Sequence, residues 1–177
     1  MIAGLVASVS MGWTVAQAAF SATATNGSNS WTAGTVVLAN ETASVLFNVG
    51  NLKPGETGSM CVVVTYNGNL TAPVKLYASA SAGALKPYVD LTVELGTGGN
   101  YASCTGFVSG STASGPETLT AFAAARTSYT DGAGVWTPTG AGQTKVYRFT
   151  YTMDGATPDV SQAAVATATF TWEARNS

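Results

Sequence analysis

Histidine is absent from the 177-residue sequence, and charged residues make up only 9% of it, against about 25% in an ordinary soluble domain. Without histidine the chain lacks the commonest general base at neutral pH and the commonest zinc ligand. A Ser-His-Asp triad and an HExxH metal site are therefore excluded within this chain. Seven basic residues against nine acidic ones leave no cationic surface to neutralise phosphates, so we expect no binding to nucleic acid.

The acidic residues are poorly placed for catalysis or for metal binding. Asp90 and Glu94 lie four positions apart in a predicted strand, which puts both carboxylates on one face roughly 13 Å apart. The paired carboxylates of glycosidases lie closer together than that. No D-x-D-x-D run offers the converging oxygens of a calcium loop. We therefore expect a protein that is not an enzyme and holds no metal and no cofactor, with a hydrolase as an alternative.

Residues 1–18 form an apolar segment that ends in Ala16-Gln17-Ala18, the small-x-small pattern at which signal peptidases cleave. Polar residues interrupt the segment, and a bilayer span needs about 20 strongly apolar residues. We therefore expect a secretory signal and no permanent membrane anchor. No cationic residue precedes Lys53, so we interpret Met1 as an internal methionine with the true start upstream. The alternative is a buried N-terminal helix or strand of the mature domain.

Two cysteines are present, Cys61 in an apolar run and Cys104 in a loop-like segment. Two cysteines in an exported chain suit a disulfide. A Cys61–Cys104 bridge would close a long loop and stabilise the fold by about 4 kcal/mol in the chain-entropy account. Two buried thiols are the alternative.

From residue 19 onward, short runs of β-branched and aromatic residues are separated by Gly, Pro and Asn, which is typical of strands joined by turns. Alternation is clearest near the end of the chain, where Tyr147, Phe149 and Tyr151 share one face. Residues 19–177 are therefore predicted to form a single all-β domain, an antiparallel sandwich. The predicted strands are 20–25, 31–39, 43–49, 59–66, 71–81, 88–95, 145–153 and 163–173.

The stretch 96–142 is rich in Gly, Ser and Thr and is long for a connection, so we expect an elaborated loop region there. Within it, the helical spacing of apolar residues in 117–125 predicts a short helix or turn. Trp136 lies in the same region and is either a core residue or an exposed contact that stacks on a sugar ring. Trp172 alternates with Phe170 and is expected in the core.

Four segments of the chain form an ordered set. They are Ala19-Phe20-Ser21 after the signal-like segment, Trp31-Thr32-Ala33-Gly34-Thr35-Val36-Val37-Leu38, Leu52-Lys53-Pro54-Gly55-Glu56, and Thr169-Phe170-Thr171-Trp172-Glu173-Ala174. Together they resemble the TasA/camelysin (CalY) family of secreted Gram-positive proteins. The resemblance covers most of the chain and implies a jelly-roll sandwich, export with a SipW-type signal peptidase, and assembly into fibres of the biofilm matrix or cell surface.

The resemblance also implies how the subunits join, because the N-terminal strand of each subunit in such fibres completes a sheet of its neighbour. Carried onto this sequence, the donor strand is 19–25: it begins at Ala19, and Phe20, Ala22 and Ala24 face the acceptor. The implied partners are further copies of the chain and other matrix components.

Two features depart from the family. Cys61 and Cys104 are not part of its basic pattern, so a disulfide here would be a local addition. The metalloprotease activity described for camelysin does not carry over, because this chain has no histidine. A second interpretation is a monomeric secreted sandwich that presents Trp136 or the 96–142 loops to a glycan or a host protein.

Overall fold

The computed structural model describes residues 21–25, 38–40, 49, 51–101 and 103–176. The predicted signal segment 1–18 and nearly all of the predicted strand 43–49 lie outside these residues.

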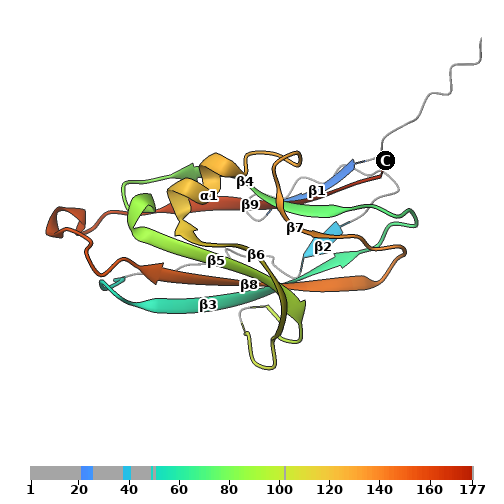
Figure 1. Ribbon diagram of the computed structural model, residues 1–177, viewed down its shortest axis with the longest axis horizontal. Helices are drawn as coiled ribbons and strands as arrows, with labels where there is room; N and C mark the ends of the chain where they lie inside the picture. The colour runs from blue at the N-terminus through green and yellow to red at the C-terminus, as the bar shows by residue number, and fades with distance from the viewer. Residues whose placement is uncertain (1–20, 26–37, 41–48, 50, 102, 177) are drawn as a thin grey trace, which may run out of the picture.

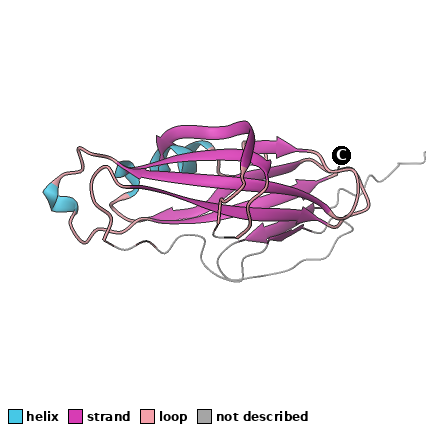
Figure 2. Ribbon diagram, turned by 90° about the horizontal axis from the view of Figure 1, so that it is seen from below, coloured by secondary structure: helices cyan, strands magenta, loops and turns pink. Residues whose placement is uncertain are grey.

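Two antiparallel sheets pack face to face along the length of the molecule (Figure 1, Figure 2). The first sheet has the order β1-β9-β4-β7 and consists of β1 (Ser21–Thr25), β9 (Thr167–Arg175), β4 (Val74–Ala82) and β7 (Ala133–Trp136). The second has the order β2-β3-β8-β5-β6 and consists of β2 (Leu38–Asn40), β3 (Thr57–Tyr66), β8 (Gln143–Met153), β5 (Val89–Thr97) and β6 (Val108–Thr118). The helical elements are α1 (Leu119–Ala125), η1 (Lys86–Tyr88) and η2 (Asp159–Ser161).

The strand order identifies the sandwich as a jelly roll. The sets β1-β9-β4-β7 and β3-β8-β5-β6 are the two four-stranded sheets that two successive Greek keys produce, and β2 adds one strand beside β3. Strands from the two ends of the chain are therefore neighbours in one sheet, as β1 and β9 show in Figure 1. The predicted all-β, jelly-roll-like sandwich is confirmed.

Aromatic side chains fill the space between the sheets. Trp172 of β9 is fully buried and packs edge-on against Tyr147 and Phe149 of β8, with ring centroids 5.6 and 6.0 Å apart. Phe170 of β9 lies 4.8 Å from Phe149 and 5.8 Å from Phe122 of α1. The inward placement of these alternating residues confirms the prediction for Phe170 and Trp172.

The short helix or turn predicted near residues 117–125 is the helix α1, which packs against β4, β5 and β6 in the half of the sandwich away from β1 (Figure 1). Thr118 is its N-cap, and the Thr118 hydroxyl accepts a hydrogen bond from the Ala121 N–H at 3.1 Å. Leu119 and Phe122 are its buried residues, so the helix adds apolar side chains to the core.

The expectation of loop structure throughout 96–142 is wrong, because that region also contains β6 and β7. β6 is an edge strand whose residues are mostly exposed, so neither face required the apolar residues that would have marked it in the sequence. Its ladder to β5 shifts register at three places.

Two strands also begin at residues other than those predicted. β2 takes up only the end of 31–39, whose residues 31–37 are not described, and β9 begins at Thr167 because a loop containing η2 precedes it.

We predict that Phe149→Ala lowers the free energy of unfolding by about 3–5 kcal/mol, because it removes a fully buried ring that contacts two others. Val135→Ala is the control: Val135 is 54% exposed, and its truncation is expected to change the same quantity by about 0.5 kcal/mol or less. Urea unfolding of both variants measures the difference. Equal effects would contradict the aromatic core.

Candidate functional site

β1 forms one edge of the first sheet, and the strand it pairs with is β9. The antiparallel ladder runs from Ser21 opposite Arg175 to Thr25 opposite Thr171 and keeps one register throughout. An edge strand leaves one row of its own backbone groups unpaired and is bonded to the sheet on one side only. β1 can therefore leave the sheet with the loss of a single ladder, whereas β9 and β4 would each lose two.

The predicted donor-strand residues are Ala19, Phe20, Ala22 and Ala24. The first two lie outside the described residues, and the last two lie in β1, where they pair with Ala174 and Trp172 of the same chain. In the single chain, the edge of β9 that a neighbour would use is thus occupied by its own β1. Any assembly through this strand has to begin with the displacement of that pairing.

β9 is held on its core face whether or not β1 is present. Trp172 and Ala174 have no exposed surface, and Phe170 is 5% exposed. β4 pairs with β9 along the opposite edge, with a shift of register near Ala78. The β4 ladder and the ring contacts of Trp172 and Phe170 with β8 and α1 do not involve β1, so they keep β9 in place as a template for a strand.

A polar cluster holds β9 on its outer face. Glu173 is only 5% exposed. Its carboxylate accepts hydrogen bonds from the Tyr77 hydroxyl at 3.0 Å and from Arg175 Nε at 2.6 Å. Burial, with the hydrogen bond to Glu173, raises the pKa of Tyr77 to about 12. The Tyr129 ring lies 4.9 Å from Lys75 Nζ and 4.6 Å from the Arg175 guanidinium carbon. The cluster thereby ties β9 to β4 and to the segment after α1.

Sequence reasoning missed this cluster. The alternation of Glu173 and Arg175 marks one face of a strand, but their partners Tyr77 and Tyr129 come from β4 and from a loop that the sequence does not place nearby. The signal that was available is the glutamate itself, because a carboxylate between residues of a core strand needs a partner.

An apolar cavity of about 370 Å³ opens between the sheets beside the first half of β9. Its lining includes Leu91 of β5, Leu119 of α1, and Ala168 and Phe170 of β9. The β1 ladder ends opposite Thr171 and does not reach this half of the strand. The cavity therefore offers apolar space next to the part of β9 that β1 leaves uncovered.

The other edges differ from the β1 edge. β7, at the far side of the first sheet, has four residues, and its ladder to β4 is irregular. β6, at the edge of the second sheet, has three register shifts in its ladder and contains Pro116. Short strands, bulges and proline are features that discourage the addition of another strand. At the remaining edge, β2 pairs with β3 in one register over three residues only, so β1 has the longest regular ladder among the described edge strands.

Trp136 lies at the end of β7, where it is half-buried and packs against the core cluster. Its neighbour Val135 is the exposed residue of that strand, at 54%. This placement favours the core interpretation of Trp136 over an exposed sugar-stacking contact.

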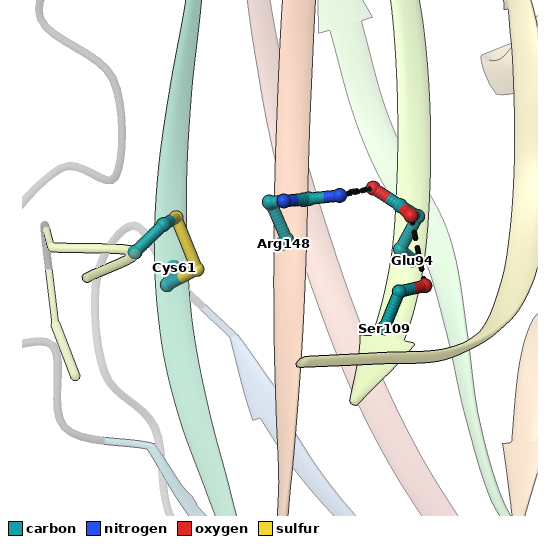
Figure 3. A network of polar contacts seen from close by, with 5 residues as sticks. Cys61, Glu94, Ser109 and Arg148 are labelled. Carbon is teal, nitrogen blue, oxygen red and sulfur yellow. Dashed lines mark hydrogen bonds and ion pairs between the residues drawn. A yellow bond between two sulfur atoms is a disulfide. The ribbon is translucent and has the colours of Figure 1, made fainter. Parts of the chain in front are cut away.

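The outer face of the second sheet carries the disulfide and an ion pair (Figure 3). Cys61 and Cys104 are bonded, as predicted, with their Cα atoms 5.2 Å apart. Glu94 accepts hydrogen bonds from Arg148 Nε and from the Ser109 hydroxyl, each at 2.8 Å. Burial alone would raise the pKa of Glu94, but these hydrogen bonds and the Arg148 charge hold it below its ordinary value. Glu94 is thus engaged in an ion pair between strands.

We predict that Glu94 makes the stability of the protein depend on pH in the acid range. Its pKa is lower in the folded protein than its ordinary value of 4.5, so its contribution is present above that value and is lost as pH falls through the lower native value. Glu94→Gln should therefore flatten the fall in unfolding free energy between about pH 5 and pH 2. Asp159→Asn, at an exposed carboxylate, should keep the wild-type slope, and equal slopes for Glu94→Gln and wild type would contradict the assignment.

Among the described residues, no group of three or more His, Cys, Asp or Glu side chains is arranged to hold a metal ion. None of the helices in the described part of the chain is long and apolar enough to cross a membrane. No known protein family matches the sequence, and no curated protein gives a significant match. The jelly-roll strand order and the regular β1 edge are therefore the features that bear on function.

Proposed function

We propose that the protein is an extracellular structural subunit that assembles into fibres by exchange of its N-terminal strand. β1 of one copy pairs with β9 of the next copy, in place of that copy's own β1. The observation that carries the proposal is the regular five-residue ladder between an edge strand and a firmly held β9. Partners are further copies of the chain, in the matrix or on the cell surface of the producing bacterium.

The β1–β9 ladder contributes the same free energy to the closed and to the exchanged form. The same residues pair within one chain or between two, so the backbone hydrogen bonds, each worth about 0.5–1.5 kcal/mol, cancel between the closed and the exchanged forms. Other terms decide the balance, namely protein concentration and any surface buried only in the fibre.

The length of the chain after β1 permits the exchange. Residues 26–37 separate β1 from β2, and a segment of that length can span roughly 40 Å at most. β1 can therefore reach the edge of a neighbouring molecule while the rest of its own sandwich stays folded. The formal net charge of −2 adds little repulsion between packed copies.

The Cys61–Cys104 bridge supports an extracellular location, because disulfides persist in oxidising compartments. Residues 1–18 would then be the export signal, removed before assembly. A free Ala19 end would leave the donor strand at the start of the mature chain.

Cysteine pairing between two variants tests the exchange. Ala22 and Ala174 face each other in the ladder, so Ala22→Cys in one preparation and Ala174→Cys in another can join only between molecules. Mixing the two under mild oxidation should give a disulfide-linked heterodimer, identified by non-reducing electrophoresis and mass spectrometry. Mixing Ala22→Cys with Val135→Cys, on the exposed surface of β7, is the control. Equal yields in the two mixtures would contradict strand exchange.

The double variant Ala22→Cys/Ala174→Cys tests whether the closed form has to open before assembly. Its new disulfide fastens β1 to β9 within one chain, so the oxidised variant should stay monomeric at concentrations where wild type assembles. Size-exclusion chromatography measures the difference. Assembly of the locked chain at the wild-type level would show that β1 does not have to leave its own sheet.

A further inference from the structure

We infer that the Cys61–Cys104 disulfide is a redox-controlled latch that holds the loop between β5 and β6 over the outer face of the second sheet. The inference concerns a different face of the molecule from the β1 edge, and it stands whether or not the chain assembles.

The loop between β5 and β6 folds back across the outer face of its own sheet. Its residues 98–107 join neighbouring strands, β5 and β6, but Cys104 is bonded to Cys61 of β3. The sheet order is β3-β8-β5-β6, so the loop crosses β8 to reach β3. In Figure 1 the loop extends below β8 and β3, and Figure 3 places Cys61 on the strand beyond Arg148. A hairpin loop without this bond has no need to turn across two strands.

The loop covers residues that an outer sheet face would otherwise expose. The Phe107 ring lies 4.5 Å from the guanidinium carbon of Arg148. It also occupies the space above Gly96, where an added Cβ would come within 2.7 Å of the ring. Val146, which pairs with Gly96 and shares the face of Arg148, is only 5% exposed, and Cys61 has no exposed surface. The loop therefore buries a small apolar patch outside the main core.

Few described contacts other than the disulfide fasten the far end of the loop to the sheet. Among its described residues, the backbone hydrogen bonds between Asn100 and Ser103 and from the Phe107 N–H to the Cys104 carbonyl stay inside the loop. Tyr101 packs against the main core and anchors the near end. Gly98 and Gly99 have φ angles of +75° and +78°, which glycine adopts without strain. The segment from Ser103 to Phe107 is thus the part that the disulfide holds down.

The two sulfurs differ in access, because Cys104 is half-buried and Cys61 is fully buried. A thiolate of a dithiol reductant attacks the sulfur of Cys104, and Cys61 leaves as a thiolate and takes up a proton. The second thiolate of the reductant then attacks the mixed disulfide and releases Cys104, so the bridge gains two electrons and the dithiol becomes a disulfide. With the latch open, the segment from Ser103 to Phe107 can leave the sheet and uncover Val146, while Tyr101 stays packed against the core.

Alkylation of Cys61 tests the latch. The folded protein is reduced with dithiothreitol, transferred into iodoacetamide, and each cysteine is followed by mass spectrometry. If the loop opens locally, Cys61 should be alkylated at a rate within about tenfold of that of Cys104, with little dependence on low urea concentrations. Alkylation of Cys61 only at the rate of global unfolding, with the full urea dependence of that transition, would overturn the inference.

Two variants keep the test decisive. Cys104→Ser leaves Cys61 as a free thiol without reductant, and its Cys61 should react as in the reduced wild type. Ser109→Ala removes a hydrogen bond to Glu94 nearby but leaves the disulfide, and without reductant it should show no alkylation of Cys61. Near-UV circular dichroism reports whether each protein keeps its aromatic core. If Cys104→Ser loses that signal, the reduced wild type alone decides, and protection of its Cys61 contradicts the latch.

Discussion

The antiparallel ladder between β1 and β9 is the interaction on which the proposed function depends. Backbone hydrogen bonds carry no sequence information, so a second copy of the chain can supply the same strand in the same register. What makes the exchange specific is the state of β9, which is fixed by Trp172 on the core side, by β4 along one edge, and by Glu173 on the outer face. An acceptor strand that is already ordered costs little to prepare for a new partner.

The edges of the two sheets are unequal, and this inequality would give the proposed assembly a direction. β6 and β7 combine irregular ladders with short length or proline, and β2 has only three residues, whereas β1 is regular over five. A strand that leaves one molecule and enters the next makes a head-to-tail contact, and such contacts form open chains when no rotation closes them. The disulfide-bound loop lies over the other sheet. The proposed strand exchange and the proposed disulfide latch therefore concern separate faces of the molecule.

The sequence predicted best where burial imposed a pattern. Alternation in β8 and β9 exists because Tyr147, Phe149 and Trp172 must face the core, and it identified both strands. The cysteine pair and the helix α1 also left local signals. β6 left none, because an exposed edge strand accepts Gly, Ser and Thr on both faces. Tyr77, which donates to Glu173, was hidden for a different reason: the two residues lie 96 positions apart along the chain, and only the fold brings them together.

We propose that the strand at the start of the mature chain joins one subunit to the next. Electron microscopy of the purified chain beginning at Ala19, beside a chain beginning at Asn26 that lacks the donor strand, tests it most directly. We expect filaments from the first chain and folded single particles from the second. Single particles from both chains, or filaments of equal yield from both, would contradict it.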